Sequence, residues 1–598
     1  MKKRIVAIIL GICMTVGMLS GCGQSKEQRA ERNPESMENN TPESGSMDSY
    51  NGSNATAPDT APSKNTGGED GGSSVQENGV YPAENNSDTD DVLCSPEISC
   101  GEAEYDNGYF AEPEGLYGED IWATEWDDTR EFPGGDEFTE IIENAFVDVR
   151  EQPLSTFSAD VDTASYSYLR QMIEGGSISE WIPKDSVRIE EMLNYFSYDY
   201  RGPRAGEPFG VNTEIAACPW NEESYLLQIG LQTEAIDFSD APPSNLVFLI
   251  DVSGSMYDAD KLPLLQQSFA MLASNLTAKD RVSIVTYAGE DEVVMTGAKG
   301  NETDRIVNAL NALTASGSTN GSAGIETAYA IARDYFIEGG NNRIILATDG
   351  DLNVGLTSVE ELERLVETER RSGVFLTVLG FGTGNLKDNR METLADKGNG
   401  NYAYIDCLSE ARKVLVEELG ATIVTVAKDV KLQVEFNSDI VREYRLIGYE
   451  NRALAAQDFT DDTKDAGEIG AGHSVTALYE VRLVRGDMQS VLSQGDVGTL
   501  HIRCKKPDGD RSVQFDYKIG RESYRRTPSS DIQFAAGVAA FGMVLRESEY
   551  RGSMGIWEVL VMLEEIDLGG DEYKEEFVDL VRTLFENEMS IRNVEWTW

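Results

Sequence analysis

The strongest constraint on the fold is a regular alternation of apolar and amphipathic segments between residues 244 and 427. Short apolar runs, such as NLVFLID at 245–251 and RIILATD at 343–349, have the length of strands. Longer segments between them repeat their apolar residues at helical spacing, as in LLQQSFAMLASNL at 264–276. Strands that are apolar throughout are typical of a mostly parallel sheet covered by helices on both faces. The pattern therefore predicts an α/β domain over 244–427 that ends in a long helix over 410–427.

Strand patterns also lie on both sides of this domain. Apolar and polar residues alternate at 209–220 and 224–236 before it, and at 430–436 and 473–484 after it. Isolated two-stranded ribbons are only marginally stable, so we expect the two sets to pair and the α/β domain to be an insertion in a β-rich domain. A helix is expected from about Thr163 to Gly175, capped by Asp162 or Ser158. The expected divisions are a 137–243 extension with helices then strands, the 244–427 domain, a 428–525 β-rich extension and a 526–598 helical tail.

The N-terminus carries an export signal. Positive charge in MKKR is followed by an apolar stretch at 5–19, which is shorter than the roughly 20 residues of a membrane-spanning helix. Leu19-Ser20-Gly21-Cys22 closes the stretch and resembles the signal of bacterial lipoproteins. This resemblance implies that residues 1–22 form a signal peptide, that Cys22 is diacylated, and that the protein is anchored on the extracytoplasmic face of the cell membrane.

Residues 23–132 differ from the rest in composition. They are rich in Ser, Asn, Gly, Pro, Asp and Glu and poor in aliphatic residues. Such a segment cannot bury enough apolar surface to offset the entropy lost on ordering, so we expect a disordered acidic tether. The net charge of the chain, −55, excludes nucleic acid as a partner, since phosphate binding needs a basic surface.

Cysteine and histidine usage limits the chemistry. Beyond Cys13 in the signal and Cys22, no pair of cysteines has the spacing of a zinc site. Disulfide pairing is left open, and a small loop closed by Cys94 and Cys100 is one option. His473 and His501 are the only histidines of the chain, which weighs against histidine-based catalysis. The remaining cysteines are Cys94, Cys100, Cys218, Cys407 and Cys504.

Five oxygen-bearing side chains are expected at one edge of the α/β sheet. Asp251, Ser253 and Ser255 follow the first strand, Thr319 lies in a Gly-rich loop, and Asp349 ends a later strand. Ligands bind such sheets at the carboxyl ends of the strands. Carboxylates and hydroxyls with retained water suit Mg²⁺, with Mn²⁺ or Ca²⁺ as alternatives. A purely structural alternative is that the first two residues cap a helix while Asp349 and Gly350 form a turn.

These motifs resemble a known family. The segments DVSGSM, GSTNG and ATDGD are similar to the metal-ion-dependent adhesion site of von Willebrand factor type A (vWA) domains, whose fold is Rossmann-like. The resemblance implies direct ligation by Ser253, Ser255 and Thr319, with Asp251 and Asp349 binding directly or through water. Flanking segments from Gln152 onward resemble the extensions of bacterial lipid-anchored or secreted vWA proteins.

Three functions follow as hypotheses. The first is a membrane-tethered binding or adhesion protein, not an enzyme, whose divalent cation coordinates an acidic side chain of a protein partner. The second is a metal-dependent hydrolase, for which Asp258 and Asp351 lie near the motifs in sequence as possible bases. The third is a conformational switch or assembly factor of the cell envelope, in which the 410–427 helix shifts on ligand binding.

Overall fold

The computed structural model describes most of the chain beyond the acidic segment. Outside the described residues lie the predicted lipidation site Cys22, the predicted tether and the predicted ligand Thr319. Within the described part, no helix combines the length and hydropathy that crossing a bilayer requires. The described residues are 136–595, with gaps at 160–161, 237–240, 290, 318–323, 351–358, 385, 419–423, 465, 508 and 510.

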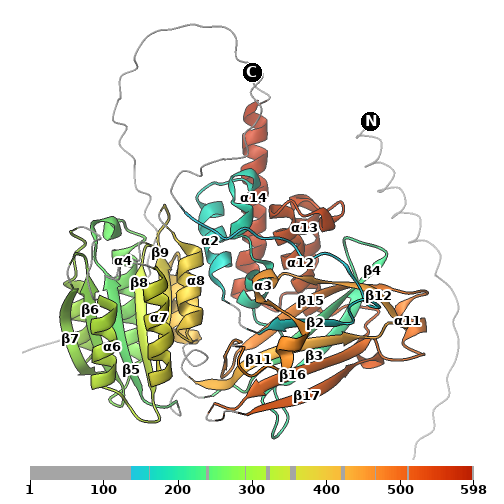
Figure 1. Ribbon diagram of the computed structural model, residues 1–598. Helices are drawn as coiled ribbons and strands as arrows, with labels where there is room; N and C mark the ends of the chain where they lie inside the picture. Colours follow the sequence, from blue (N-terminus) through green and yellow to red (C-terminus); the bar gives the residue numbers. More distant parts are fainter. Residues whose placement is uncertain are drawn as a thin grey trace, which may run out of the picture. The chain divides into compact units, whose positions relative to one another are not determined.

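The central α/β unit is built on a six-stranded sheet in the order β10-β9-β8-β5-β6-β7 (Figure 1). All neighbours are parallel except β6 and β7, which are antiparallel. Every residue of β5 and β8 is buried, as expected for strands covered on both faces. The strands are β5 (Ser244–Asp251), β6 (Arg281–Tyr287), β7 (Asp291–Lys299), β8 (Asn341–Thr348), β9 (Val374–Phe381) and β10 (Tyr402–Ile405).

Helices cover both faces of this sheet. Along β5, Leu246, Phe248 and Ile250 pack in one core with α4, α5 and α9, whereas Val247 and Leu249 pack in a second core with α6, α7 and α8. This alternation follows from the two-residue repeat of a strand. The predicted fold class is thus confirmed. The helices are α4 (Leu262–Asn275), α5 (Thr303–Asn311), α6 (Gly324–Asp334), α7 (Val359–Glu369), α8 (Asp388–Lys397) and α9 (Leu408–Arg412).

The strands that flank the α/β unit pair across it into two antiparallel sheets. Strand β4 precedes the unit and pairs with β15 behind it, and β2 pairs with β11 in the same way. The inner faces of both sheets share one core, so the α/β unit is inserted in a β-rich body, as expected. One sheet is β1 (Val147–Asp148), β12 (Val441–Ile447), β15 (Ser474–Leu483), β4 (Ser224–Gln232) and β3 (Gly210–Ala217). The other is β13 (Ala453–Leu454), β2 (Leu154–Ser158), β11 (Thr425–Phe436), β16 (Gly498–Lys505) and β17 (Ser512–Ile519), with β14 (Ile469–Gly470) beside β11.

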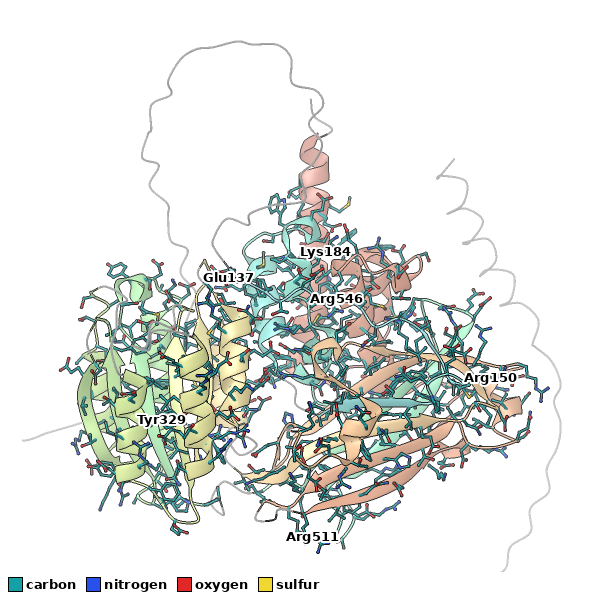
Figure 2. The ribbon with its side chains drawn as sticks, in the orientation of Figure 1. Glu137, Arg150, Lys184, Tyr329, Arg511 and Arg546 are labelled. Carbon is teal, nitrogen blue, oxygen red and sulfur yellow. The ribbon has the colours of Figure 1, made fainter. Side chains whose placement is uncertain are left out.

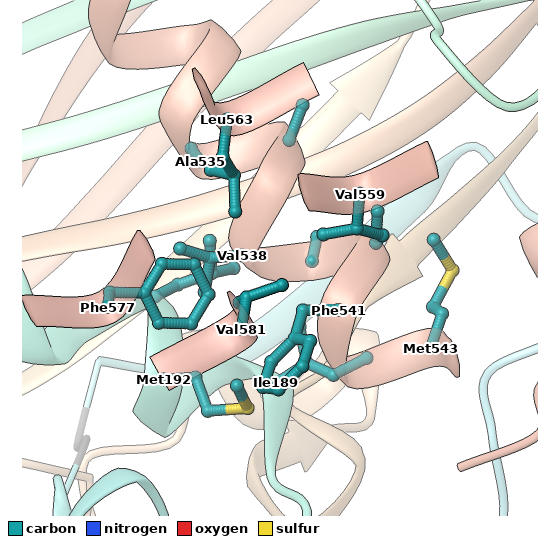
Figure 3. Packing of buried hydrophobic residues seen from close by; sticks show 14 of the residues in the cluster. Ile189, Met192, Ala535, Val538, Phe541, Met543, Val559, Leu563, Phe577 and Val581 are labelled. Carbon is teal, nitrogen blue, oxygen red and sulfur yellow. The ribbon is translucent and has the colours of Figure 1, made fainter. Parts of the chain in front are cut away.

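Helices that precede and follow the α/β unit in the sequence form a further core, part of which Figure 3 shows. Helix α12 is apolar on all sides and is buried almost throughout, which is typical of a central helix. Phe541 of α12 packs in this core with Ile189 of α3 and Val581 of α14. The helices are α2 (Ala164–Glu174), α3 (Ile189–Tyr195), α12 (Ser530–Leu545), α13 (Ile556–Glu564) and α14 (Glu572–Glu595), and α11 (Met488–Val491) is a single turn elsewhere.

Direct contacts join the N-terminal extension to the α/β unit. The backbone N–H of Glu137, labelled in Figure 2, donates to the carbonyl of Leu386, 2.9 Å away. The ammonium of Lys387 donates to the Glu137 carboxylate at 2.8 Å, and this ion pair lowers the pKa of Glu137. The extension therefore holds the segment just before α8.

Two local predictions need correction. The predicted 410–427 helix is helical only as far as Glu417, where α9 continues into one π-helical turn (Lys413–Glu417), and its last residues lie in strand β11, which starts at Thr425. The β-branched residues Thr425 and Val426 favour this strand, which pairs here with β14. Asp162 does not cap α2, which begins without a side-chain cap. Its carboxylate instead accepts the N–H of Tyr402 at 2.8 Å and pairs with Arg452 at 3.2 Å, a stronger charge-assisted contact.

Candidate metal site

The topology of the sheet singles out one edge for a ligand. The chain leaves β5 toward β6 on one side, while β8 lies on its other side, so the direction of winding reverses between β5 and β8. Open α/β sheets bind ligands at the carboxyl ends of the strands at such a reversal. Asp251 is the last residue of β5, and Asp349 directly follows β8. Both acids therefore lie at the position where a ligand is expected.

The first loop is held by its own hydrogen bonds. Oδ1 of Asp251 accepts the N–H of Ser253 at 2.8 Å, and Oδ2 accepts the hydroxyl of Thr348 at 3.3 Å. The hydroxyls of Ser253 and Ser255 lie 3.0 Å apart. Ser253 is fully buried, whereas Ser255 is exposed, so the pair runs from the interior of the edge to solvent. Ser253 precedes the 3-10 turn η5 (Gly254–Tyr257) without a side-chain cap bond, which is against the purely structural alternative for this residue.

The second loop is brought to the first by backbone hydrogen bonds. The N–H of Gly254 donates to the carbonyl of Gly317 at 3.3 Å, and the N–H of Ser316 donates to the carbonyl of Val252 at 2.8 Å. Gly317 has a φ of +91°, which favours glycine. The predicted ligand Thr319 lies outside the described residues, two positions beyond this contact.

The Asp349 side chain completes the described part of the site. It is 1% exposed, and its Oδ2 accepts a hydrogen bond from the Lys261 ammonium at 2.9 Å. Its Oδ1 is buried and makes no hydrogen bond to any residue that the structure describes. A buried carboxylate oxygen without a donor is costly unless a cation or water satisfies it.

The electrostatics of the two acids also indicate a need for positive charge. The pKa of Asp251 is raised to about 6, mainly by burial and also by the charge of Asp349, although the hydrogen bonds from Ser253 and Thr348 lower it. A divalent cation between the two carboxylates would relieve both effects. The donor set therefore fits a hard cation of the Mg²⁺ class, with the two acids and the two hydroxyls as its ligands.

Hydroxyl groups are essential to such a site. Among the described residues, no three His, Cys, Asp or Glu side chains are gathered in a way that could hold a metal ion. Both histidines lie elsewhere: His501 is in β16, and His473 lines a pocket of about 470 Å³ beside Arg343, near the start of β8. Burial lowers the pKa of His473, in agreement with a structural role.

The sequence pattern predicts the two acids of the site but not the residues that contact them. Thr348 and Lys261 were not predicted to take part, although both contact a predicted ligand. The lysine directly precedes α4, ten positions after Asp251, and its spacing carries no signal for a contact with β8.

Cys218, Cys407 and Cys504 are free thiols, and burial raises the pKa of the Cys504 thiol to about 11.

Comparisons with known proteins agree with this fold. A family model described as von Willebrand factor type A domain matches residues 245–418, and one described as von Willebrand factor matches 133–228. The protein is therefore a vWA domain-containing protein. A third model, described as uncharacterized protein YfbK, C-terminal, matches residues 421–586. Uncharacterized protein YfbK of Escherichia coli K12 is 41% identical over 472 residues, which cover 75% of this chain and 81% of that protein. The chain belongs to the YfbK family.

Other matches have lower sequence identity. The magnesium-chelatase 67 kDa subunit of Chlorobaculum parvum is 24% identical over 233 residues, covering 34% of this chain and 37% of that protein. The solved structure of a von Willebrand factor type A protein from Catenulispora acidiphila has 15% identity and a TM-score of 0.38. It covers 65% of this chain and 91% of that one.

Proposed function

We propose that this chain is a lipid-anchored binding protein of the cell envelope. Its vWA domain holds one divalent cation, Mg²⁺ or alternatively Mn²⁺ or Ca²⁺, through Asp251, Ser253, Ser255, Thr319 and Asp349. The cation coordinates an acidic side chain of a protein partner. The observation that carries the proposal is the buried Oδ1 of Asp349, which makes no hydrogen bond to the described residues beside a second buried carboxylate.

The proposal includes a noncatalytic role for the cation, which the described surroundings support; Asp351, one of the two candidate bases, lies outside the described residues. A hydrolase needs a general base next to the metal-bound water. The exposed Asp258 ends the η5 turn, and its carbonyl accepts the N–H of Lys261. The charged side chain in contact with Asp349 is that of Lys261, which is a donor and not a base when protonated. Capture of a partner carboxylate uses the positive charge of the cation directly and requires no base.

The metal site predicts a specific response to cations. Adding Mg²⁺ or Mn²⁺ is expected to raise the melting temperature of the parent chain, because a ligand that binds only the folded state stabilises it by about 2.7 kcal/mol at one hundred times its Kd. Asp251→Ala is expected to remove most of this rise, measured by thermal unfolding with and without a chelator.

Asp280→Ala is the matched control for this experiment. Asp280 is also a buried acid of the α/β unit, but it caps the other end of the sheet, where it accepts the N–H groups of Ser244 and Thr277. The Asp280→Ala substitution should lower the melting temperature, while the rise in melting temperature on adding metal persists. Equal responses of Asp251→Ala and the parent chain would falsify the metal assignment.

The partner is tested separately. We expect the purified chain to retain envelope proteins in a pull-down with Mg²⁺, and to lose them both with a chelator and in the Asp251→Ala variant. Mass spectrometry of the retained fraction identifies candidates, and charge-neutral variants of their exposed acids should weaken capture. Retention that is unchanged by the chelator contradicts a metal-mediated contact.

A further inference from the structure

The candidate site already contains a positive charge of the chain itself. Lys261 is 6% exposed, and its ammonium lies 2.9 Å from Oδ2 of Asp349. This residue directly precedes α4, and its carbonyl accepts the N–H of Leu265 in the first turn of that helix. The helix start therefore fixes the backbone from which the side chain reaches the end of β8.

A glycine makes room for the lysine. Gly382 follows β9 with a φ of +67°. A Cβ atom at this position would come within 2.4 Å of Cε and 2.5 Å of Cγ of Lys261. The aliphatic stem of the lysine thus lies directly against the backbone of Gly382. Because the lysine is flexible, it is the lysine that would have to move if residue 382 had a side chain.

We propose that Lys261 is a built-in counter-ion that competes with the divalent cation for Asp349, an inference that rests on the proposed function. Without metal, the two buried acids carry two negative charges, and the ammonium neutralises one of them. With metal, the ammonium and a divalent cation together exceed the charge of the acids by one. Their repulsion, in a poorly screened environment, weakens cation binding.

The consequence is a site that is stable when empty and exchanges its cation readily. Lys261 acts as a positioning residue and not as a ligand, because an ammonium has three donors and no acceptor for a metal. Its ammonium binds Oδ2 of Asp349 and leaves Oδ1 of the same carboxylate without a hydrogen bond to the described residues. The affinity for metal is then set by the lysine as well as by the ligands.

The test is a Mn²⁺ titration of the purified full chain, followed by the electron paramagnetic resonance signal of free Mn²⁺. Lys261→Met removes the charge and keeps much of the stem. It is expected to bind Mn²⁺ about tenfold more tightly than the parent chain, because the competing charge is gone. The metal-free variant is expected to melt at a lower temperature, since Asp349 loses its partner.

Lys431→Met is the matched control. Lys431 of β11 is also buried and pairs with Asp429 at 3.0 Å, in the β-rich body and not in the α/β unit. This variant should melt at a lower temperature with an unchanged Mn²⁺ affinity. Gly382→Ala offers a second route, since displacing the lysine should also tighten Mn²⁺ binding. Should Lys261→Met not fold, Lys261→Gln removes the charge and keeps a donor.

The possible outcomes separate the two claims. A parent chain that binds no Mn²⁺ overturns the proposed metal site and this inference together. A parent chain that binds Mn²⁺ while the Lys261 variant binds with equal or lower affinity overturns only the inference. Tighter binding by the Lys261 variant, but not by the Lys431 variant, supports it.

Discussion

Replacing Arg170 with methionine is expected to lower the free energy of unfolding by about 3–5 kcal/mol, since buried carboxylates then lose their counter-charge. Arg170 lies in α2 and its side chain is 2% exposed. Its Nε is 2.7 Å from Oδ2 of Asp406, and its Nη2 is 2.8 Å from Oε2 of Glu410. Its Nη1 is 2.6 Å from Oε1 of Glu576 in α14. One guanidinium therefore joins the N-terminal extension, the α/β unit and the helical tail.

Arg582→Met is the matched control for this change, measured by denaturant unfolding. Arg582 pairs with Asp579 and Glu564 but is 39% exposed, so the change should cost less than about 1 kcal/mol. A loss in Arg170→Met no larger than that of the control would contradict a role for the buried cluster in joining the three parts.

The loss in Arg170→Met is also expected to depend on pH. Burial raises the pKa of Glu410 to about 7 in the parent, with Arg170 offsetting only part of the effect. Without Arg170, this pKa rises further. An acid whose pKa is raised by folding contributes stability at low pH, and that contribution is lost as pH rises through the folded pKa. The variant should therefore be less impaired at pH 5 than at pH 8.

Much of the α/β unit could be predicted because its signals are local. Fully apolar strands such as β5 and β8 and the helices between them are each encoded in a short window of sequence. Strand β7 was missed because it lies at the edge of the sheet, where Val293 is exposed and the apolar pattern is broken. The helix predicted to end the unit was wrong in its last residues, because pairing with a strand distant in sequence decides the conformation of Thr425.

The candidate site also has a part that the sequence predicts and a part that it does not. Its acids could be predicted because Asp251 ends β5 and Asp349 directly follows β8, and parallel strands end at one edge. The contact of Lys261 with Asp349 joins residues 88 positions apart, and that of Arg170 with Glu576 joins residues 406 apart. Neither has a periodic or spacing signal, because each depends on how whole elements pack.

The helical core leads to a prediction about the helical tail. Phe577→Ala is expected to lower the free energy of unfolding by about 3–5 kcal/mol, because removal of a fully buried ring leaves a cavity. The ring of Phe577 in α14 lies 5.3 Å from that of Phe196, which follows α3, and 5.5 Å from that of Phe541 in α12. The ring therefore joins the N-terminal extension to the helical tail, and Figure 3 shows it close to Val538 of α12.

Met589→Ala is the control on the same helix, since this side chain is 42% exposed and its loss should change stability by less than about 0.5 kcal/mol. Denaturant unfolding of both variants measures the difference. Phe577 packs in the helical core, whereas the candidate metal site is supported by the two cores of the α/β unit. The Phe577 variant should thus keep the Asp251-dependent response to Mn²⁺ at temperatures where it is folded. Loss of that response in the folded variant would mean that the tail and the metal site are coupled.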